Sequence, residues 1–193
     1  MGRSSEATPV TTEAAATKLV AACRGGFESS SYHTPISPLE RRNIAEYITG
    51  YIDGEGCFTV TFNVRTEAKL GWELRPSFSV SQNEDRRQVL DLIRVYFGRG
   101  AIRRDYADRT VKFEIRDHYD LITKIIPHFE QYPLLSKKQC DFELFKQICE
   151  LVDRHEHLKA EGFAVAVHLA YQMNGSGKRK RTKEEITRSL RRR

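Results

Sequence analysis

The sequence has no long run of apolar residues. Of its 193 residues, 39% are hydrophobic and 30% are charged, and no stretch approaches the roughly 20 apolar residues of a membrane-spanning helix. The first 38 residues lack the apolar run of a secretory signal peptide, and they contain as many acids as bases, unlike a transit peptide. We therefore expect no membrane partner and a protein that is not secreted.

Cysteine is also scarce, with four residues at positions 23, 57, 140 and 149. They form no Cys-x-x-Cys pair, which argues against a disulfide framework and against the common zinc sites. Cys149 is followed by His155 and His157, but this spacing matches no common zinc pattern. We expect reduced, structural thiols, and a location in the cytoplasm of a prokaryote or in an organellar stroma or matrix.

Positive charge is nearly balanced by acids except at one end of the chain. Residues 178–193 hold nine Lys or Arg against two Glu, so the remaining residues sum to −1 of the total of +6. We interpret residues 174–193 as a basic tail that forms a flexible or induced arm over phosphates, the alternative being a nuclear-localisation-like or solubilising end. Residues 1–38 are rich in Ser, Thr and Ala and cannot bury enough surface to offset their ordering entropy. We expect that segment to be disordered or loosely attached, ahead of a domain over residues 39–173.

The most informative stretch is ITGYIDGEG, residues 48–56, where an apolar helix pattern ends in alternating acids and glycines. Apolar residues recur at helical spacing from about Arg41 onward, which predicts a helix. Gly54 and Gly56 lack Cβ, so the backbone can turn sharply there and approach a neighbour closely. Such an ending would deliver Glu55 to a metal where two helices meet. The alternative is an ordinary helix-to-strand corner with both acids solvated.

Two kinds of periodicity follow the motif. Period-two alternation predicts strands over 57–66, 72–82, 100–106 and 109–116, and helical spacing predicts helices over 84–97, 118–129, 136–153 and 157–172. Each strand has one apolar and one polar face, which is typical of an antiparallel sheet covered on one side. The sequence therefore predicts an α+β fold with the order αββαββα.

Residues 48–56 resemble the motif of the LAGLIDADG homing endonucleases, in the single-motif form. Ile48, Thr49 and Gly50 stand for Leu-Ala-Gly, Tyr51 and Ile52 for Leu-Ile, and Asp53, Gly54, Glu55 and Gly56 for Asp-Ala-Asp-Gly. Thr49, Tyr51 and Glu55 depart from the pattern, the last by one methylene that keeps the carboxylate. The element order is also that of the family's half-domain, so the resemblance spans about residues 40–153. It implies a four-stranded antiparallel sheet curved into a saddle that lies along the DNA major groove.

The resemblance implies an active site at the end of the motif helix. Glu55 and the main-chain carbonyl of Gly54 would bind Mg²⁺, with Mn²⁺ possible, while Asp53 closes the helix turn and binds metal only secondarily. Further active-site residues would be Gln82, Arg86 and a lysine near Tyr132–Lys138, for which Lys138 fits the spacing best and Lys137 is the alternative. As ordinary structural residues, the glutamine would cap a helix and the lysines would be solvated.

The resemblance also assigns the polar face of the sheet to double-stranded DNA. The predicted contact residues are Thr59, Thr61, Asn63, Arg65, Arg75, Ser77, Ser79, Arg103, Lys112 and Arg116. Polar alternation alone usually marks only the wet side of a sheet, and the motif is what favours base and phosphate contacts.

The sequence contains one copy of the motif, whereas a saddle over a full site needs two half-domains. We therefore expect a homodimer through the motif helices, with Ile48, Thr49, Gly50 and Ile52 at the interface, and a partly palindromic target. The implied function is intron homing, by a Mg²⁺-dependent double-strand break. The alternative is a maturase that binds intron RNA, or a DNA-binding regulator without catalysis.

Overall fold

A computed structural model describes residues 38–105, 109–175 and 179–190 of the chain. The expected loose segment over residues 1–37 lies outside the described residues. The chain divides into two units at Ile44, and the account below concerns the second unit, Ala45–Arg193. Among the described residues no helix is both long enough and apolar enough to cross a membrane.

The order of elements predicted from the sequence is confirmed. The chain runs through helix α2 (Pro38–Glu55), strands β1 (Gly56–Val64) and β2 (Trp72–Asn83), a 3-10 turn η1 (Glu84–Arg86), helix α3 (Arg87–Phe97), and strands β3 (Ala101–Asp105) and β4 (Thr110–Ile115). It continues through α4 (His118–Asp120), a π-helical turn η2 (Leu121–Ile125), α5 (Ile126–Gln131), α6 (Lys138–Asp153), a 3-10 turn η3 (Glu156–Leu158), α7 (Ala160–Ala170) and α8 (Lys183–Leu190). The predicted helix 118–129 is thus built from three short pieces.

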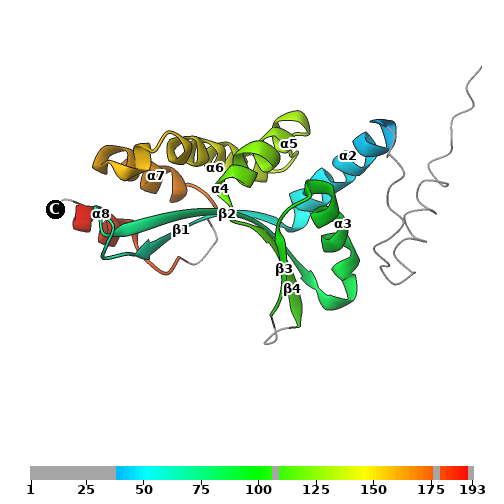
Figure 1. Ribbon diagram of the computed structural model, residues 1–193, viewed down its shortest axis with the longest axis horizontal. Helices are drawn as coiled ribbons and strands as arrows, with labels where there is room; N and C mark the ends of the chain where they lie inside the picture. The colour runs from blue at the N-terminus through cyan, green and yellow to red at the C-terminus, as the bar shows by residue number, and fades with distance from the viewer. Residues whose placement is uncertain (1–37, 106–108, 176–178, 191–193) are drawn as a thin grey trace, which may run out of the picture. The chain divides into compact units, whose positions relative to one another are not determined.

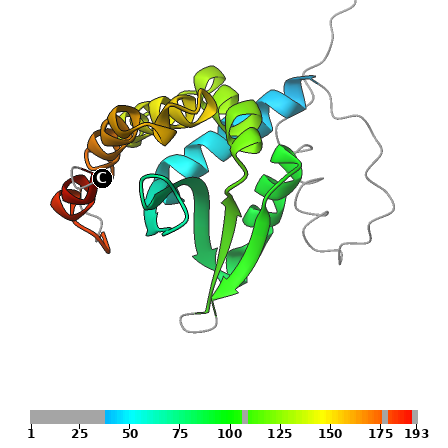
Figure 2. The ribbon, with the colours of Figure 1, turned by 60° about the vertical axis from the view of Figure 1, so that its left-hand side comes forward.

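The four strands form one antiparallel sheet in the order β1-β2-β4-β3. Helices α5, α6 and α7 lie on one side of it, and the β3-β4 hairpin turns away from the long β1-β2 hairpin (Figures 1 and 2). The other side of the sheet carries the polar residues of the alternating strands. This is the half-covered α+β sheet that the alternation predicts.

A cluster of aromatic rings joins the sheet to the helices. Phe58 of β1 is 1% exposed, and its ring lies 5.3–5.5 Å from the rings of Phe78, Phe129, Phe142 and Phe145. Burial of each such side chain contributes about 1.5–3 kcal/mol. Because Phe58 follows the motif by two residues, this cluster fixes the start of β1, and with it the end of α2.

A buried polar contact fixes the middle of α2. The Nε2 atom of His128 lies 3.0 Å from the hydroxyl of Thr49, and its Nδ1 atom lies 3.1 Å from the hydroxyl of Tyr96 on α3. His128 is 5% exposed. Burial lowers the pKa of His128 to about 4, so its ring is neutral at neutral pH and links α2 to α3 by hydrogen bonds.

We predict that His128 makes the protein acid-sensitive. The pKa of His128 is 6.5 in the unfolded chain and about 4 in the folded chain. At a pH between these two values, the ring is protonated in the unfolded chain and neutral in the folded chain. Stability is therefore fully present above the ordinary value and falls as the pH drops below it, by up to about 3 kcal/mol. Urea unfolding of the wild type and of His128→Gln, at pH 7 and at about pH 4.5, measures this. The variant should lack most of the extra loss, and an equal pH dependence in both proteins would contradict the prediction.

Candidate functional site

Helix α2 passes directly into β1 between Glu55 and Gly56, and only Gly56 is sterically required there. A Cβ on Gly56 would lie 2.4 Å from Cγ2 and 2.8 Å from the carbonyl oxygen of Ile52. By contrast, a Cβ on Gly54 would meet nothing within 4 Å, and Gly54 is helical and exposed. The sharp turn expected at Gly54 is therefore absent, and the close approach occurs one step later, at the helix-to-strand junction.

The carboxylate of Asp53 ties α2 to the segment that precedes α6. It accepts hydrogen bonds from the backbone N–H groups of Leu135 (3.1 Å) and Ser136 (3.0 Å), and from the Ser136 hydroxyl. The prediction that Asp53 closes its own helix turn is therefore wrong. The residue holds a distant loop instead, and these contacts use both of its carboxylate oxygens.

Lys138 reaches the same helix end from the first turn of α6. Its ammonium donates a hydrogen bond to the carbonyl oxygen of Ile52, at 2.8 Å. Burial lowers the pKa of Lys138, and the nearby charges of Asp53 and Glu55 oppose that shift. Lys137, the alternative, is exposed. Of the two lysines, Lys138 is the one that contacts α2 in the structure.

The other predicted active-site residues lie around this point. Glu55 is exposed at the last position of α2. The side-chain amide of Gln82 donates to the hydroxyl of Tyr51 at 2.6 Å, while its oxygen accepts from the N–H of Asn83 at 2.8 Å. Arg86 is exposed in η1, which follows β2 directly. Gln82 therefore contacts the motif helix through a tyrosine and does not cap η1.

The donor atoms at the helix end suit a hydrated hard cation. Within the described part of the chain, no three or more His, Cys, Asp or Glu side chains group as a metal-binding cluster, and this includes Cys149, His155 and His157. A closed structural zinc site is therefore absent from that part. A single exposed carboxylate such as Glu55 fits Mg²⁺, which keeps several waters and is often completed by substrate phosphates.

The expected dimer surface needs correction. Ile48 and Ile52 are 0% exposed and Thr49 is 7% exposed, because their side chains pack into the core of their own chain. Gly50 is exposed, as is Gly54 one turn later. Of the four predicted interface residues, only Gly50 lies on the outer face of α2, because the apolar face of the motif is used by its own domain.

Strand register places eight of the ten predicted DNA-contact residues on the polar face, and Arg65 and Arg116 each lie one residue beyond a strand end. Thr59 lies opposite Ser77, Thr61 opposite Arg75, and Arg103 opposite Lys112, and Asn63, Arg65, Ser79 and Arg116 belong to the same alternation. Ser77 and Ser79 are only 8% and 4% exposed. With so little of their surface accessible, they are poorly placed to contact a ligand directly.

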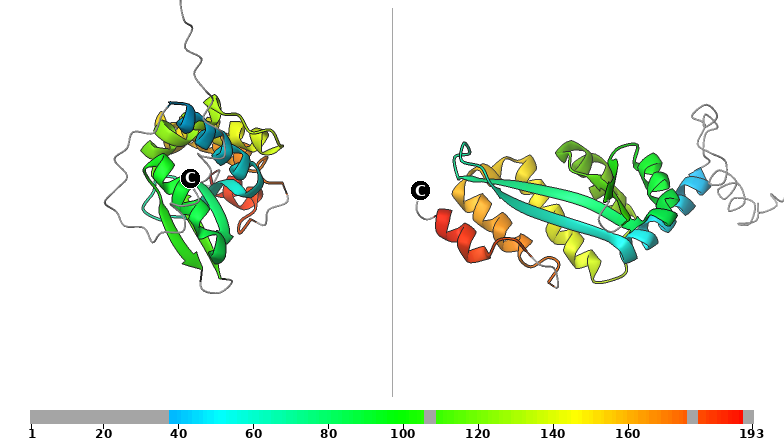
Figure 3. Two further views of the ribbon diagram at one scale, coloured as in Figure 1. Left: turned by 90° about the vertical axis from the view of Figure 1, so that its right-hand side faces the viewer. Right: turned by 90° about the horizontal axis from the view of Figure 1, so that it is seen from below.

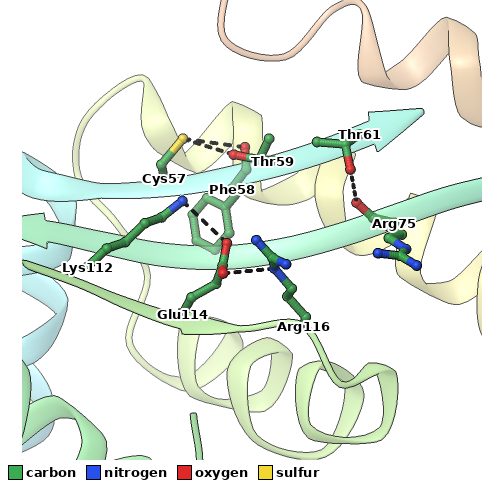
Figure 4. A network of polar contacts seen from close by, with 8 residues as sticks. All are labelled: Cys57, Phe58, Thr59, Thr61, Arg75, Lys112, Glu114 and Arg116. Carbon is green, nitrogen blue, oxygen red and sulfur yellow. Dashed lines mark hydrogen bonds and ion pairs between the residues drawn. The ribbon is translucent and has the colours of Figure 1, made fainter. Parts of the chain in front are cut away.

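Two acids on this face, Glu73 and Glu114, were left out of the predicted contact set. Glu73 pairs with Arg65 (3.4 Å) and Arg75 (2.9 Å). Glu114 pairs with Lys112 (3.3 Å) and Arg116 (2.8 Å), as Figure 4 shows. Both acids are two residues from a predicted contact on the same strand, so strand alternation was the signal that could have found them.

The described part of the basic tail is docked on the domain. Asn174 donates to the carbonyl of Phe58 (2.7 Å) and Arg179 to that of Val60 (3.3 Å), both on β1, the edge strand. Helix α8 lies beside α7 (Figure 3), with Ile186 0% exposed. Residues 179–190 thus contact their own domain, at the sheet edge through Arg179 and at α7 through α8, and an arm over phosphates stays a prediction.

The chain resembles known intron-encoded proteins. A family pattern described as LAGLIDADG endonuclease matches residues 48–149, just over half of the chain. The probable intron-encoded endonuclease 2 of Neurospora crassa is 39% identical over 117 residues, which cover 60% of this chain and 26% of the relative. An uncharacterised 50.9 kDa protein in ND4 intron 1 of Podospora anserina is 34% identical over 68% of this chain and 28% of its own length. The chain thus spans about a quarter of each relative.

Solved structures match the fold more completely. The homing endonuclease I-TnaI superposes with a TM-score of 0.67 at 32% identity, over 77% of this chain and 96% of that one. The archaeal intron-encoded homing endonuclease I-Vdi141I, complexed with DNA, gives 0.72 at 27% identity over 78% and 97%. I-SmaMI, bound to uncleaved DNA in the presence of calcium ions, gives 0.68 at 28% identity, over 77% of this chain and 49% of that one.

Proposed function

The chain belongs to the LAGLIDADG endonuclease family, and from this we propose that it is a site-specific endonuclease that hydrolyses both strands of double-stranded DNA. The observation that carries the proposal is the grouping of Glu55 and Lys138 at the end of the motif helix. This group lies where α2 meets β1, the first strand of a sheet with one polar face. A catalytic carboxylate and an amine are thus joined to a surface suited to a major groove.

We assign the metal to Glu55, with the carbonyl of Gly54 as a second donor. A bound Mg²⁺, or Mn²⁺ in its place, would supply Lewis-acid charge at the scissile phosphate. Lys138 has a lowered pKa and would hold or donate a proton near the phosphate, while Gln82 and Arg86 would orient water and balance charge. We give Asp53 no metal role, because its oxygens already accept three hydrogen bonds from Leu135 and Ser136.

We propose that two copies of the domain form the working enzyme. The chain corresponds to 49% of I-SmaMI but to 96% and 97% of I-TnaI and I-Vdi141I, which is what one half-domain would give. A two-fold axis beside the exposed Gly50 and Gly54 would bring two Glu55 carboxylates to neighbouring phosphates. The target would then be at least partly palindromic.

A second candidate function is binding without cleavage, as an intron RNA maturase or a DNA-binding regulator. A relative named for an intron of ND4 favours an intron-borne element, but it does not favour RNA over DNA. The presence of Glu55, Gln82, Arg86 and Lys138 together favours the nuclease, because a binding protein would not need that set. Plasmid nicking that depends on a divalent cation separates the two functions.

We predict that Glu55→Gln blocks cleavage but not DNA binding. The amide keeps the shape of the side chain and removes the charge that binds the cation, so the cleavage rate should fall at least roughly a hundredfold. Cleavage of a selected target and gel-shift affinity are measured side by side, with the exposed Glu161→Gln on α7 as the control. Substantial Mg²⁺-dependent cleavage by the Glu55 variant would remove this residue from the metal site.

The two neighbouring lysines give a matched test. Lys138→Met should lower the cleavage rate roughly a hundredfold, because it removes the amine at the end of α2. Lys137→Met should stay within about twofold of the wild type, because Lys137 is exposed. Single-turnover rates on one target, with DNA affinity checked for each variant, compare them. An equal loss in both variants, or a loss in Lys137→Met alone, would contradict the assignment.

We predict that Gly50→Leu weakens the dimer and lowers cleavage together. A Cβ at Gly50 meets nothing within 4 Å in the single chain, so folding should tolerate the change while a close helix partner should not. The dimer dissociation constant should rise by roughly tenfold or more. Light scattering at micromolar concentration checks this, with Gln147→Leu on the exposed face of α6 as the control. A wild-type monomer that makes double-strand breaks would refute the dimer.

A further inference from the structure

The polar face of the sheet holds two carboxylates among the bases proposed to contact DNA, and they differ in burial. The Glu114 side chain on β4 is 7% exposed, whereas that of Glu73 on β2 is 25% exposed. A buried carboxylate in the middle of a DNA-contact surface is unfavourable for phosphate binding, because it repels the backbone. Its position therefore needs a physical explanation.

The contacts of Glu114 supply that explanation. It accepts from the Nε atom of Arg116 at 2.8 Å through one oxygen and from the Nζ atom of Lys112 at 3.3 Å through the other. Both cations lie beside it along the strand direction, one on each side (Figure 4). They remain 54% and 45% exposed, so each keeps donor groups directed at solvent. The buried Glu114 carboxylate thus holds two cations whose side chains remain accessible to solvent.

A cation held in this way favours bases over phosphates. The shared carboxylate reduces the attraction of both cations for an anionic phosphate, but it affects a neutral acceptor much less. In the major groove, guanine presents two neutral acceptors, O6 and N7, to Arg or Lys. Holding each side chain in one position also lowers the entropy cost of contacting a base edge.

The backbone positions of Lys112 and Arg116 span several base-pair steps, and their head groups lie closer together because both contact Glu114. Lys112 and Arg116 are four residues apart, which is about 13 Å at about 3.3 Å per residue of strand. That distance is close to four steps of the DNA helix at about 3.4 Å each. Both head groups contact Glu114, which lies midway between Lys112 and Arg116 along the strand. They would therefore reach base pairs near the middle of that four-step span.

We propose that Glu114 is a positioning residue that determines sequence specificity, by holding Lys112 and Arg116 for guanine edges and by disfavouring phosphate contacts. The inference rests on the proposed function, since it requires duplex DNA on this face. Glu114 would contact no DNA itself, but it would influence which DNA sequence is bound.

The test compares Glu114→Gln with the wild type in two measurements. Selection from a random duplex library should show guanine preference reduced roughly tenfold at the positions read by Lys112 and Arg116. Affinity for non-specific duplex should rise, and the slope of log affinity against log salt should steepen by about 0.9 for each cation released to a phosphate. The control is Glu130→Gln, which breaks an ion pair with Lys146 in the helical layer and should change neither measurement.

Arg116→Gln keeps the inference testable if Glu114→Gln does not fold, because Arg116 is exposed. It should relax preference at the same base pairs. Unchanged base preference in either folded variant would overturn the role of Glu114 while leaving the endonuclease intact. A wild-type protein that selects no duplex sequence at all would overturn the proposed function and this inference with it.

Discussion

The attachment of the end of α2 to the start of α6 is the constraint on which the candidate site depends. The last carbonyls of a helix have no partner within the helix, and here the Ile52 carbonyl accepts from Lys138. One residue further on, the carboxylate of Asp53 accepts from the backbone of Leu135 and Ser136. In both contacts the donors come from residues 135–138 and the acceptors lie on α2, so a shift of α2 against the start of α6 would break both.

This attachment also sets the chemistry of the site. Lys138 is held where burial lowers the pKa of its amine and where the charges of Asp53 and Glu55 oppose that shift. Because Asp53 is occupied by backbone donors, Glu55 is left as the exposed carboxylate of the pair. The two acids of the motif thus differ in the structure, because Asp53 is used in hydrogen bonds to a distant loop while Glu55 is exposed.

Helix α2 and the sheet each have one face that packs into the core and one face that does not. The apolar side of α2 is used by its own core, through Ile48, Ile52 and the contact between Thr49 and His128. The glycine positions of its outer side, Gly50 and Gly54, are exposed. On the sheet, the apolar face is covered by helices, while on the polar face Glu73 and Glu114 each form ion pairs with two cations. The candidate DNA surface therefore combines cations with carboxylates that hold them in position, and its net positive charge is smaller than the number of its bases.

The sequence by itself determined the elements and named the residues of the candidate site. Alternation in residues 57–66 and 109–116 and helical spacing before Gly56 depend on local backbone geometry, so they could be read without coordinates. The motif likewise identified Glu55 and the neighbourhood of Lys138. Only the tertiary structure decided how Asp53 is used, which lysine contacts α2, which face of α2 is buried, and how Arg179 docks on β1. Each of these joins residues about 80 or more positions apart in the chain, or depends on which neighbour covers a face, and no local pattern records such a distance.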